Sequence, residues 1–493
     1  MKKPPHRDGV AFCVSPRRYA AAMSETPQYR TAPLKTDALP PGIGYIVGNE
    51  AAERFSYYGM RAILVAFMTK HLLDASGQPD TLGPERAKEV FHDFSTAVYF
   101  FPIVGAIAAD WLFGKYRVIV GLSLLYCVGH GILALMDAPH LVGAEPRTLL
   151  YLGLGCIAVG AGGIKPCVSA HVGDQFGSGN AHLLDRVFAW FYFSINLGAT
   201  VSTLLTPVLL DRYGAGWAFG VPGVLMALAT LVFWLGRHSF AHVPPGRDRF
   251  VAAMTSREGW HSILRLLPAL GFFIAFWMLF DQTSSAWVIQ AEAMRGELPV
   301  SLPLFGDELL PSQLQAINPV LVMLFIPLFN YGLYPLAGRL VTVTPLRKIG
   351  VGLALVGLSF VVAGWIEQMI AATPEGEPPP HRMWQAVPYL LITAAEILVS
   401  ITGLEFAYSQ SPKTMKSIVM GLFFLTIAAA NFIVARINGY IDAAHKAGDT
   451  DFLTGESYYY LFAVIAAASS VGFILWSLTY RYQTHLQGDA IEE

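Results

Sequence analysis

Charge is scarce in this chain of 493 residues, since Asp, Glu, Lys and Arg together make up only 14% of it. Soluble globular proteins carry about 25%. Hydrophobic residues reach 54%, which is more apolar side chain than a soluble fold of this size can remove from water. A lipid bilayer can accommodate that much, so the composition predicts a membrane protein and excludes a string of soluble domains.

Cysteines, basic runs and a signal sequence are also rare or missing. The four cysteines lack the spacing of metal ligands, and three lie in apolar runs, so we expect neither a disulfide nor a metal. No lysine- and arginine-rich block predicts a nucleic-acid partner, and the formal net charge is -2. Residues 1–40 lack the apolar core of a signal peptide, and we expect a disordered cytoplasmic tail there.

Long apolar runs, by contrast, recur along the chain. A membrane-spanning helix needs about 20 mostly apolar residues, and twelve segments qualify: 42–71, 88–113, 116–136, 147–174, 184–209, 216–236, 262–290, 315–338, 347–370, 385–410, 414–441 and 456–480. We therefore expect an all-α polytopic protein. Its predicted parts are a tail (1–40), a six-helix bundle (41–237), a cytoplasmic linker (238–261), a second six-helix bundle (262–482) and a tail (483–493).

The distribution of lysine and arginine predicts the orientation. Loops at one end of the predicted helices carry Lys115, Arg117, Arg237, Arg247, Arg249, Arg257, Arg339, Arg347, Lys348, Lys413 and Lys416. Loops at the other end carry mainly Asp and Glu, as at Asp74 and Glu292. Because basic loops stay in the cytoplasm, both termini are expected inside. Two six-helix halves joined by an inside linker suit a rocker-switch transporter, whose site lies between the halves near the midplane.

Ionisable groups within these apolar helices are candidate site residues, because each costs at least about 2.5–3.5 kcal/mol at the bilayer centre. The first helix has one polar stripe at the spacing i, i+4, i+7, i+11 with two flanking polar residues: Glu50, Arg54, Tyr57 and Arg61, with Glu53 and Tyr58 beside them. Such a stripe predicts a helix face on a wet cavity. The alternative is a salt-bridged cluster that only holds the bundle together.

Depth along the helices, at about 1.5 Å per residue, predicts two contacts. Lys165 on the fourth helix lies at the level of Glu50 and Glu53 and can reach either of them. Arg61 and Asp281 lie nearer the outer surface, at equal depth in opposite halves. We expect these two to pair as an outer gate.

Other polar residues share helix faces in pairs four positions apart: Tyr192 with Asn196, Trp277 with Asp281, and Glu405 with Ser409. Tyr192 and Trp277 fit ordinary packing as well as a substrate pocket. Glu405 has no cation near it in its segment, which favours a functional acid. His92 lies near the outer end of the second helix, where a group that titrates near physiological pH suits proton coupling; a structural role is the alternative.

Five motifs occur in an order that is typical of one transporter family. They are Glu50-x-x-Glu53-Arg54-Phe55-x-Tyr57-Tyr58-Gly59, Gly163-Ile164-Lys165-Pro166 to Gly173-Asp174-Gln175-Phe176, Phe191-Tyr192-Phe193-Ser194-Ile195-Asn196-Leu197-Gly198, Phe276-Trp277-x-x-Phe280-Asp281-Gln282, and Glu405-Phe406-x-Tyr408-Ser409-Gln410. With them the sequence resembles the proton-dependent oligopeptide transporter family of the major facilitator superfamily, over about residues 42–480.

The resemblance implies a major facilitator fold and a proton-coupled symporter that imports di- and tripeptides by alternating access. It implies a multi-pass protein of the cell (inner) membrane that works as a monomer, with protons as the coupling ion and without a cofactor. It also implies roles for single residues. Arg54 and Lys165, with Arg61 nearby, would hold the peptide carboxylate. Glu405, helped by Asn196 and followed by Ser409, would hold the amine.

Further roles are implied by the same resemblance. The aromatic residues would form side-chain pockets: Tyr57, Tyr58, Tyr99, Tyr192 and Trp277. Glu50 and Glu53 resemble proton-linked acids, and His92 is similar in placement to the coupling histidine of animal members. Phe423 stands where animal members often carry Trp, and the two extra helices of many bacterial members are missing between the halves.

Three other functions compete with peptide import. The plant nitrate branch of the family keeps much of the first-helix motif, so a nitrate or other anion carrier is an alternative; Glu405 argues against it, because an amine clamp repels an anion. A receptor would need a substantial soluble output domain, which the sequence does not contain. An enzyme is not expected, since no nucleophile–base constellation or metal motif occurs.

Overall fold

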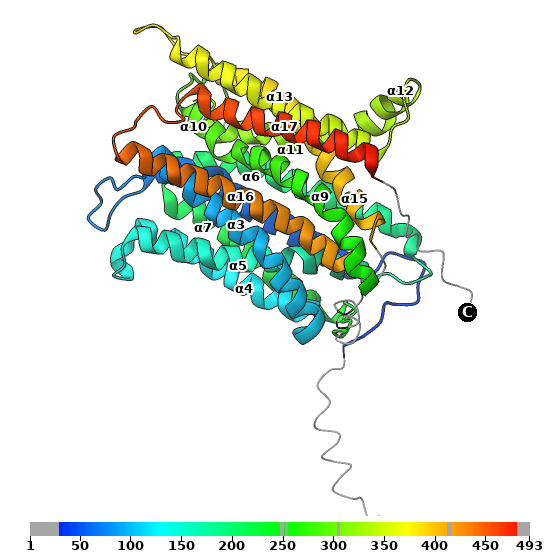
Figure 1. Cartoon of the computed structure of the whole chain (residues 1–493). Helices are drawn as coiled ribbons and strands as arrows, with labels where there is room; N and C mark the ends of the chain where they lie inside the picture. Colours follow the sequence, from blue (N-terminus) through cyan, green and yellow to red (C-terminus); the bar gives the residue numbers. More distant parts are fainter. Residues whose placement is uncertain are drawn as a thin grey trace, which may run out of the picture.

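Long helices run side by side through a computed structural model that describes residues 29–246, 251, 255, 257–302, 306–411 and 416–480 (Figure 1). The first half contains α2 (Ile43–Ala66) with η1 (Phe67–His71), α3 (Pro84–Ile107) with η2 (Ala108–Phe113), α4 (Lys115–Ala134), α5 (Pro146–Gly173), α6 (Leu184–Tyr213) and α7 (Ala215–Leu235). Short turns connect them: η3 (Leu135–Asp137), η4 (Pro139–Leu141), η5 (Ala181–Leu183) and η6 (Gly236–His238).

The second half has the same plan. Its long helices are α9 (Arg257–Phe280) with η7 (Asp281–Ser284) and α10 (Ala286–Glu292), α11 (Ile317–Leu328) with η9 (Phe329–Leu333) and α12 (Tyr334–Gly338), α13 (Pro345–Ala371), α14 (Ala386–Glu396) with η11 (Ile397–Ile401) and α15 (Thr402–Ser409), α16 (Lys416–Lys446) and α17 (Glu456–Thr479). Between them lie β1 (Glu297–Leu302), β2 (Gly306–Glu308), η8 (Pro311–Ala316) and η10 (Arg382–Gln385). The two strands form an antiparallel hairpin.

Eleven helices of the described chain are long and apolar enough to cross a membrane. The helix α2 is not one of them, because it carries the four charges of the predicted polar stripe: Glu50, Glu53, Arg54 and Arg61. With α2 included, the helices match the twelve predicted spans to within a few residues at their ends. The predicted all-α, multi-pass fold is therefore confirmed. We call the end of the bundle where α2 begins the inner end, and the opposite end the outer end.

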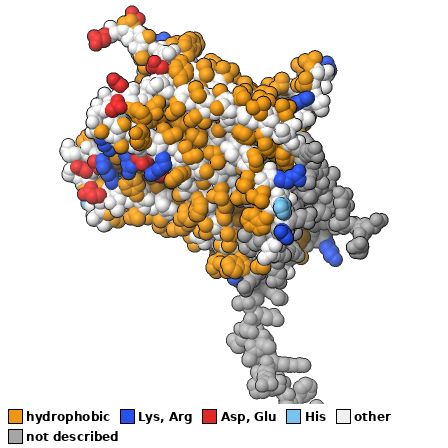
Figure 2. All heavy atoms as spheres, in the orientation of Figure 1, with side chains coloured by type: hydrophobic (Ala, Val, Ile, Leu, Met, Phe, Trp, Pro, Cys, Tyr) orange, Lys and Arg blue, Asp and Glu red, His pale blue; other side chains and the backbone are white. Residues whose placement is uncertain are grey.

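Each half packs around its own apolar core. Tyr57, Phe91 and Phe219 are buried in the first, and Trp287 and Phe360 in the second. The halves meet mainly where α3 lies against α16 and α6 against α11, and α3 and α16 are side by side in Figure 1. Hydrophobic side chains predominate on the face shown in Figure 2, as expected for helices that face lipid.

Glycines allow close helix contacts in the first half. A Cβ atom on Gly105 of α3 would lie 2.4 Å from the carbonyl oxygen of Gly163 on α5, and one on Gly129 of α4 would lie 2.8 Å from that of Gly153. No side chain fits in either place. Gly153 and Gly163 of α5 therefore serve helix packing, as expected for small residues in membrane bundles, whereas Gly155 has open space around it.

The segment just before α2 corrects one prediction, because residues 29–40 are packed against the inner end and are not disordered. Arg30 Nη2 donates to the carbonyl oxygen of Ser239 (2.6 Å), and the Tyr29 ring stacks on His242 with centroids 4.3 Å apart. The partners of Arg30 and Tyr29 lie in the loop after η6, and composition alone does not predict these contacts. The tail residues 1–28 and 481–493, and the linker and loop residues Arg247, Arg249 and Lys413, lie outside the described residues.

Candidate functional site

A cavity of ≈ 390 Å³ lies between the two halves. Four helices of the first half (α2, α3, α5 and α6) and segments around α9, α11, α14 and α16 of the second half line it. Nine residues predicted from the sequence are on its wall: Glu50, Arg54, Tyr58, Arg61, Tyr99, Lys165, Tyr192, Asn196 and Trp277. Phe423 is also there. The polar stripe of α2 therefore faces a cavity, as predicted.

The two acids of α2 form ion pairs with Arg54, the first of the two arginines on this helix. Arg54 Nε lies 2.6 Å from Glu50 Oε1 and 3.1 Å from Glu53 Oε2, and both acids are buried. The spacing i, i+4 places Glu50 and Arg54 on one face of the helix, where they can pair. The salt-bridged cluster considered above thus exists, but it forms part of the cavity wall.

Lys165 does not pair with either acid, contrary to the prediction. No acid of the described chain lies within 4 Å of its ammonium group; its Nζ lies 4.3 Å from the ring centroid of Tyr57 and 4.2 Å from that of Tyr99. Ring faces attract a cation, and Glu50 and Glu53 are already engaged by Arg54. Tyr57 is fully buried, so it supports Lys165 from behind the wall.

Arg61 and Asp281 pair across the halves, which confirms the predicted contact. Arg61 Nη2 lies 2.5 Å from Asp281 Oδ1, and the two side chains are 7% and 2% exposed. The Arg61 guanidinium also lies over the Phe91 ring, 5.3 Å from its centroid. Arg61 lines the cavity, and the role of the pair as an outer gate stays a prediction.

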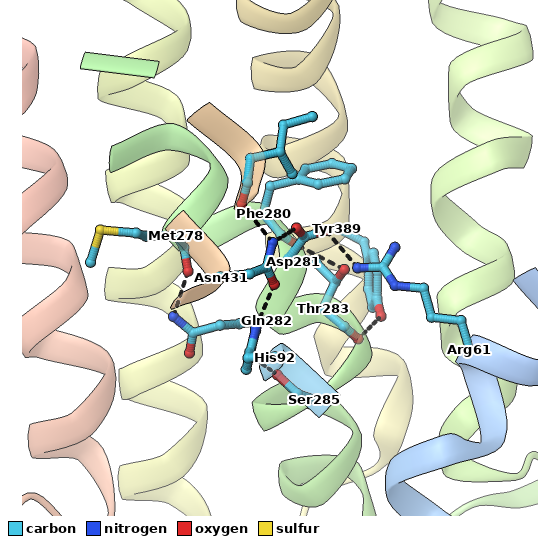
Figure 3. A network of polar contacts seen from close by, with 11 residues as sticks. Arg61, His92, Met278, Phe280, Asp281, Gln282, Thr283, Ser285, Tyr389 and Asn431 are labelled. Carbon is cyan, nitrogen blue, oxygen red and sulfur yellow. Dashed lines mark hydrogen bonds and ion pairs between the residues drawn. The ribbon is translucent and has the colours of Figure 1, made fainter. Parts of the chain in front are cut away.

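Asn431 extends this pair to His92 (Figure 3). Asn431 Nδ2 donates to Asp281 Oδ2 (2.6 Å), and its Oδ1 lies 2.7 Å from His92 Nδ1. The Asp281 carboxylate can only accept a hydrogen bond, so the Asn431 amide nitrogen must face Asp281 and the amide oxygen must face His92. His92 Nδ1 therefore carries the proton, and His92 Nε2 accepts from Ser285 Oγ at 2.9 Å. Asn431 was missed from the sequence, where its only signal was an amide side chain within the apolar run of α16.

The predicted position of Glu405 is wrong. Its side chain is exposed and not among the described residues of the cavity wall, and Ser409, also off that wall, donates to the carbonyl of Phe406. Glu396, nine positions earlier, lines the cavity instead. Nine positions on a regular helix amount to a half-turn difference in direction, and the π-helical turn η11 lies between the two acids. They therefore face different sides.

Glu396 is the acid on the second half's wall of the cavity. Its Oε2 accepts from Asn318 Nδ2 at 2.7 Å, and Asn318 also contacts Thr393 Oγ1 at 3.1 Å. In the first half, Asn196 Nδ2 donates to the carbonyl of Tyr192 (2.9 Å). The cavity thus has cationic groups on the wall of one half and a carboxylate on the wall of the other.

Comparison with known proteins shows the family of this chain. Residues 116–257 and 249–453 match the family model described as the POT family. The chain belongs to the POT family. It is 36% identical over 374 residues to Peptide transporter family 1 of Drosophila melanogaster, covering 66% of this chain and 48% of that protein. It is also 36% identical over 422 residues to Solute carrier family 15 member 2 of Mus musculus, with 76% and 55% covered.

This POT-family chain spans about half the length of the curated relatives it matches. A solved POT family transporter, PepTSo, matches more completely. The two folds superpose with a TM-score of 0.78 at 36% identity, covering 90% of this chain and 99% of that one. Family membership and the major facilitator type of fold are therefore confirmed, and the named relatives are transporters and not enzymes.

Proposed function

We propose that this chain is a proton-coupled symporter that imports di- and tripeptides by alternating access. The observation that carries the proposal is the opposition of charges across the cavity. Arg54 and Lys165 on the first half would bind the free carboxylate of a peptide, and Glu396 on the second half would bind its free amine. Charge-assisted hydrogen bonds are strong in a cavity with little water. A zwitterionic peptide of the right length can therefore contact both halves of the protein at once.

The remaining wall suits many peptide side chains. It is largely aromatic and apolar, with Tyr58, Tyr99, Tyr192, Trp277 and Phe423. Charged groups bind only the two ends of the peptide, while side chains meet surfaces without fixed hydrogen-bond partners. Its volume is within the usual range of ligand pockets, about 300–1,000 Å³. This favours a carrier that accepts many short peptides.

A charge count supports coupling to protons. The charged groups of the site are four acids and three bases, which gives a net -1 with His92 neutral: Glu50, Glu53, Asp281 and Glu396 against Arg54, Arg61 and Lys165. One added proton makes the site neutral, and a bound zwitterion leaves it neutral. A neutral loaded carrier can reorient without moving net charge through a medium of low dielectric constant.

The contacts between the halves support a role in alternating access. Besides Arg61 with Asp281, the outer end has Lys70 Nζ 3.6 Å from Glu292 Oε2, and Gln315 Nε2 donating to the carbonyl of Ala62 at 3.0 Å. A proton on His92 Nε2 would reverse its hydrogen bond with Ser285 Oγ and place a positive charge near Arg61, within the contacts that join the halves. Protonation there would weaken this closure and favour outward opening, whereas protonation of Glu50 or Glu53 would favour the inward step.

We further propose that both termini are cytoplasmic, that the protein lies in the cell membrane as a monomer, and that it needs no cofactor. The alternative of nitrate or another anion is disfavoured by Glu396, because a carboxylate on the cavity wall repels an anion. Uptake of labelled dialanine into proteoliposomes tests the proposal. An inward proton gradient should drive accumulation, whereas uptake of nitrate with no uptake of dialanine would refute it.

A further inference from the structure

Two further cavities of the first half meet near the inner end, where α4 begins. The first, of ≈ 310 Å³, lies within the membrane-spanning parts of α3, α4 and α5. Glycine and apolar residues such as Val104, Leu122 and Val159 line it, and Arg117 is the only charged residue of the described chain on its wall. It is an apolar groove with a single cation.

The second cavity, of ≈ 250 Å³, lies beyond the helix ends and has several ionisable side chains on its wall. Its wall includes Lys115, His171 and His242, with Tyr29 and Tyr116. Two residues belong to both cavities: Phe113 and Arg117. The apolar groove therefore leads directly to a pocket of cationic and ionisable side chains, and Arg117 stands at the junction.

An unsatisfied hydrogen-bonding atom points to a ligand in this second cavity. His171 is 1% exposed, and its Nε2 has no hydrogen-bond partner in the described chain. The nearest ionisable groups that act on it electrostatically are His242 and Lys115. A buried imidazole nitrogen without a partner is costly, and a ligand with acceptor oxygens or a water held by such a ligand would satisfy it.

The field in this pocket is positive. Burial lowers the pKa of His242, and the charges of His238, Arg30 and Arg117 lower it further. Two acids moderate the field: Asp174 Oδ2 lies 2.7 Å from Lys115 Nζ, and Asp110 also interacts electrostatically with Lys115. Arg117 is exposed and makes no ion pair with any acid of the described chain. An anion that reached it would gain a charge-assisted contact without breaking one.

We propose that the groove and the pocket together bind one phospholipid from the leaflet at the inner end, which is the cytoplasmic leaflet on the predicted topology. One acyl chain would fill the groove, and the phosphate would lie against Arg117 with Lys115 beside it. The neighbouring residues Leu112 and Phe113 are 54% and 57% exposed at the helix end, as suits the boundary between lipid tails and headgroups. A free phosphate ion would use the pocket but not the groove.

Gly121 allows the groove to be tested separately. It lies on the groove wall, and a Cβ atom there would meet no atom within 4 Å, so a side chain can start at this position and Gly121→Leu is chosen to occupy the groove. Gly131→Leu, on the same helix and equally unobstructed, is the matched control. For the phosphate, Arg117→Gln is compared with Arg347→Gln, which changes an exposed arginine near the start of α13 in the other half.

The experiment measures binding to delipidated full-length protein in detergent, by thermal shift during titration with dioleoyl phosphatidylglycerol and, separately, with inorganic phosphate. Arg117→Gln should weaken phospholipid binding at least about tenfold, because it removes one charge-assisted contact. Gly121→Leu should weaken it as strongly, and both controls should match the unmodified protein. Inorganic phosphate alone should give no comparable shift.

Two results would overturn the proposal. Equal stabilisation by inorganic phosphate, unaffected by Gly121→Leu, would identify a soluble-anion site. No saturable phospholipid effect, or one unchanged in both Arg117→Gln and Gly121→Leu, would remove the site altogether. Neither measurement involves peptide uptake, so a failure here leaves the proposed transport function untouched, and the reverse also holds.

Discussion

Arg61 of α2 and Asp281 of η7 form an ion pair across the two halves, with 2.5 Å between Nη2 and Oδ1. Both side chains are buried, so each charge depends on the other: breaking a buried pair by removing one partner costs about 3–5 kcal/mol, even where the intact pair adds little net stability. Asn431 donates to the same carboxylate, and His92 is hydrogen-bonded to Asn431. A titratable residue is therefore connected to the contact that we expect to act as an outer gate.

The first prediction concerns that pair. Asp281→Ala should lower dipeptide uptake at least about tenfold, because it leaves Arg61 buried without a partner. Exchanging the two residues (Arg61→Asp with Asp281→Arg) should restore part of the activity. Asp93→Asn is the control: Asp93 also pairs across the halves, with Arg436, but both side chains are about half exposed, and such pairs contribute little. Normal uptake by Asp281→Ala would exclude the gate.

The second prediction separates coupling from binding at His92. Counterflow exchanges substrate without net proton movement, whereas uphill uptake requires it. His92→Ala should therefore abolish gradient-driven accumulation and retain measurable exchange, and Asn431→Leu should act in the same direction. His130, whose Nδ1 contacts the carbonyl of Phe219 within the first half, offers a control for loss of a buried imidazole. Uphill uptake that survives in His92→Ala removes this residue from the mechanism.

A third prediction tests the carboxylate end of the site. Lys165→Gln keeps much of the side-chain length but loses the charge held between Tyr57 and Tyr99. The half-saturating concentration of dialanine should rise about tenfold, the usual effect of losing one charge-assisted contact. Dialanine amide, which has no carboxylate, should be affected much less. Equal losses for both compounds would show that Lys165 acts on the fold and not on the peptide terminus.

The fourth prediction is the topology. The basic loops at the inner end place both termini and the loop around residue 250 in the cytoplasm. Reporter domains fused at residue 250 and after residue 493 should both report a cytoplasmic location, and one fused in the acidic loop near Asp74 should not. A periplasmic signal from either of the first two fusions would reverse the orientation.

The sequence predicted features that depend on helix periodicity and depth. The α2 stripe and the Arg61–Asp281 contact follow from the spacing of residues along helices. The positions of the apolar runs in the sequence determine that spacing well. The prediction gave Lys165 the right depth in the membrane but the wrong partners. Depth alone does not show that Arg54 already pairs with the nearby acids, nor that two tyrosine rings lie next to Lys165. The ordered segment at Tyr29 and Arg30 depends on a loop far away in the sequence.

The choice between Glu396 and Glu405 shows the same limit. Both lie in one apolar run, nine positions apart, so regular helix geometry directs them to opposite sides but does not say which side meets the cavity. A motif drew attention to Glu405, while only the packed structure shows which carboxylate faces the cavity. Asn431 was missed for a related reason, since an amide in a span gains meaning only from Asp281 and His92 beside it.

The most direct test of the account compares Glu396→Gln with Glu405→Gln for proton-driven uptake of dialanine and N-acetyl-dialanine into proteoliposomes. Glu396→Gln should lose most uptake of the free-amine peptide and little of the already poor uptake of the acetylated one, because only the first has an ammonium group for the carboxylate. Glu405→Gln, changed on the exposed face, should transport both normally. Unchanged dialanine uptake by Glu396→Gln would contradict the recognition of peptides by opposed charges across the cavity.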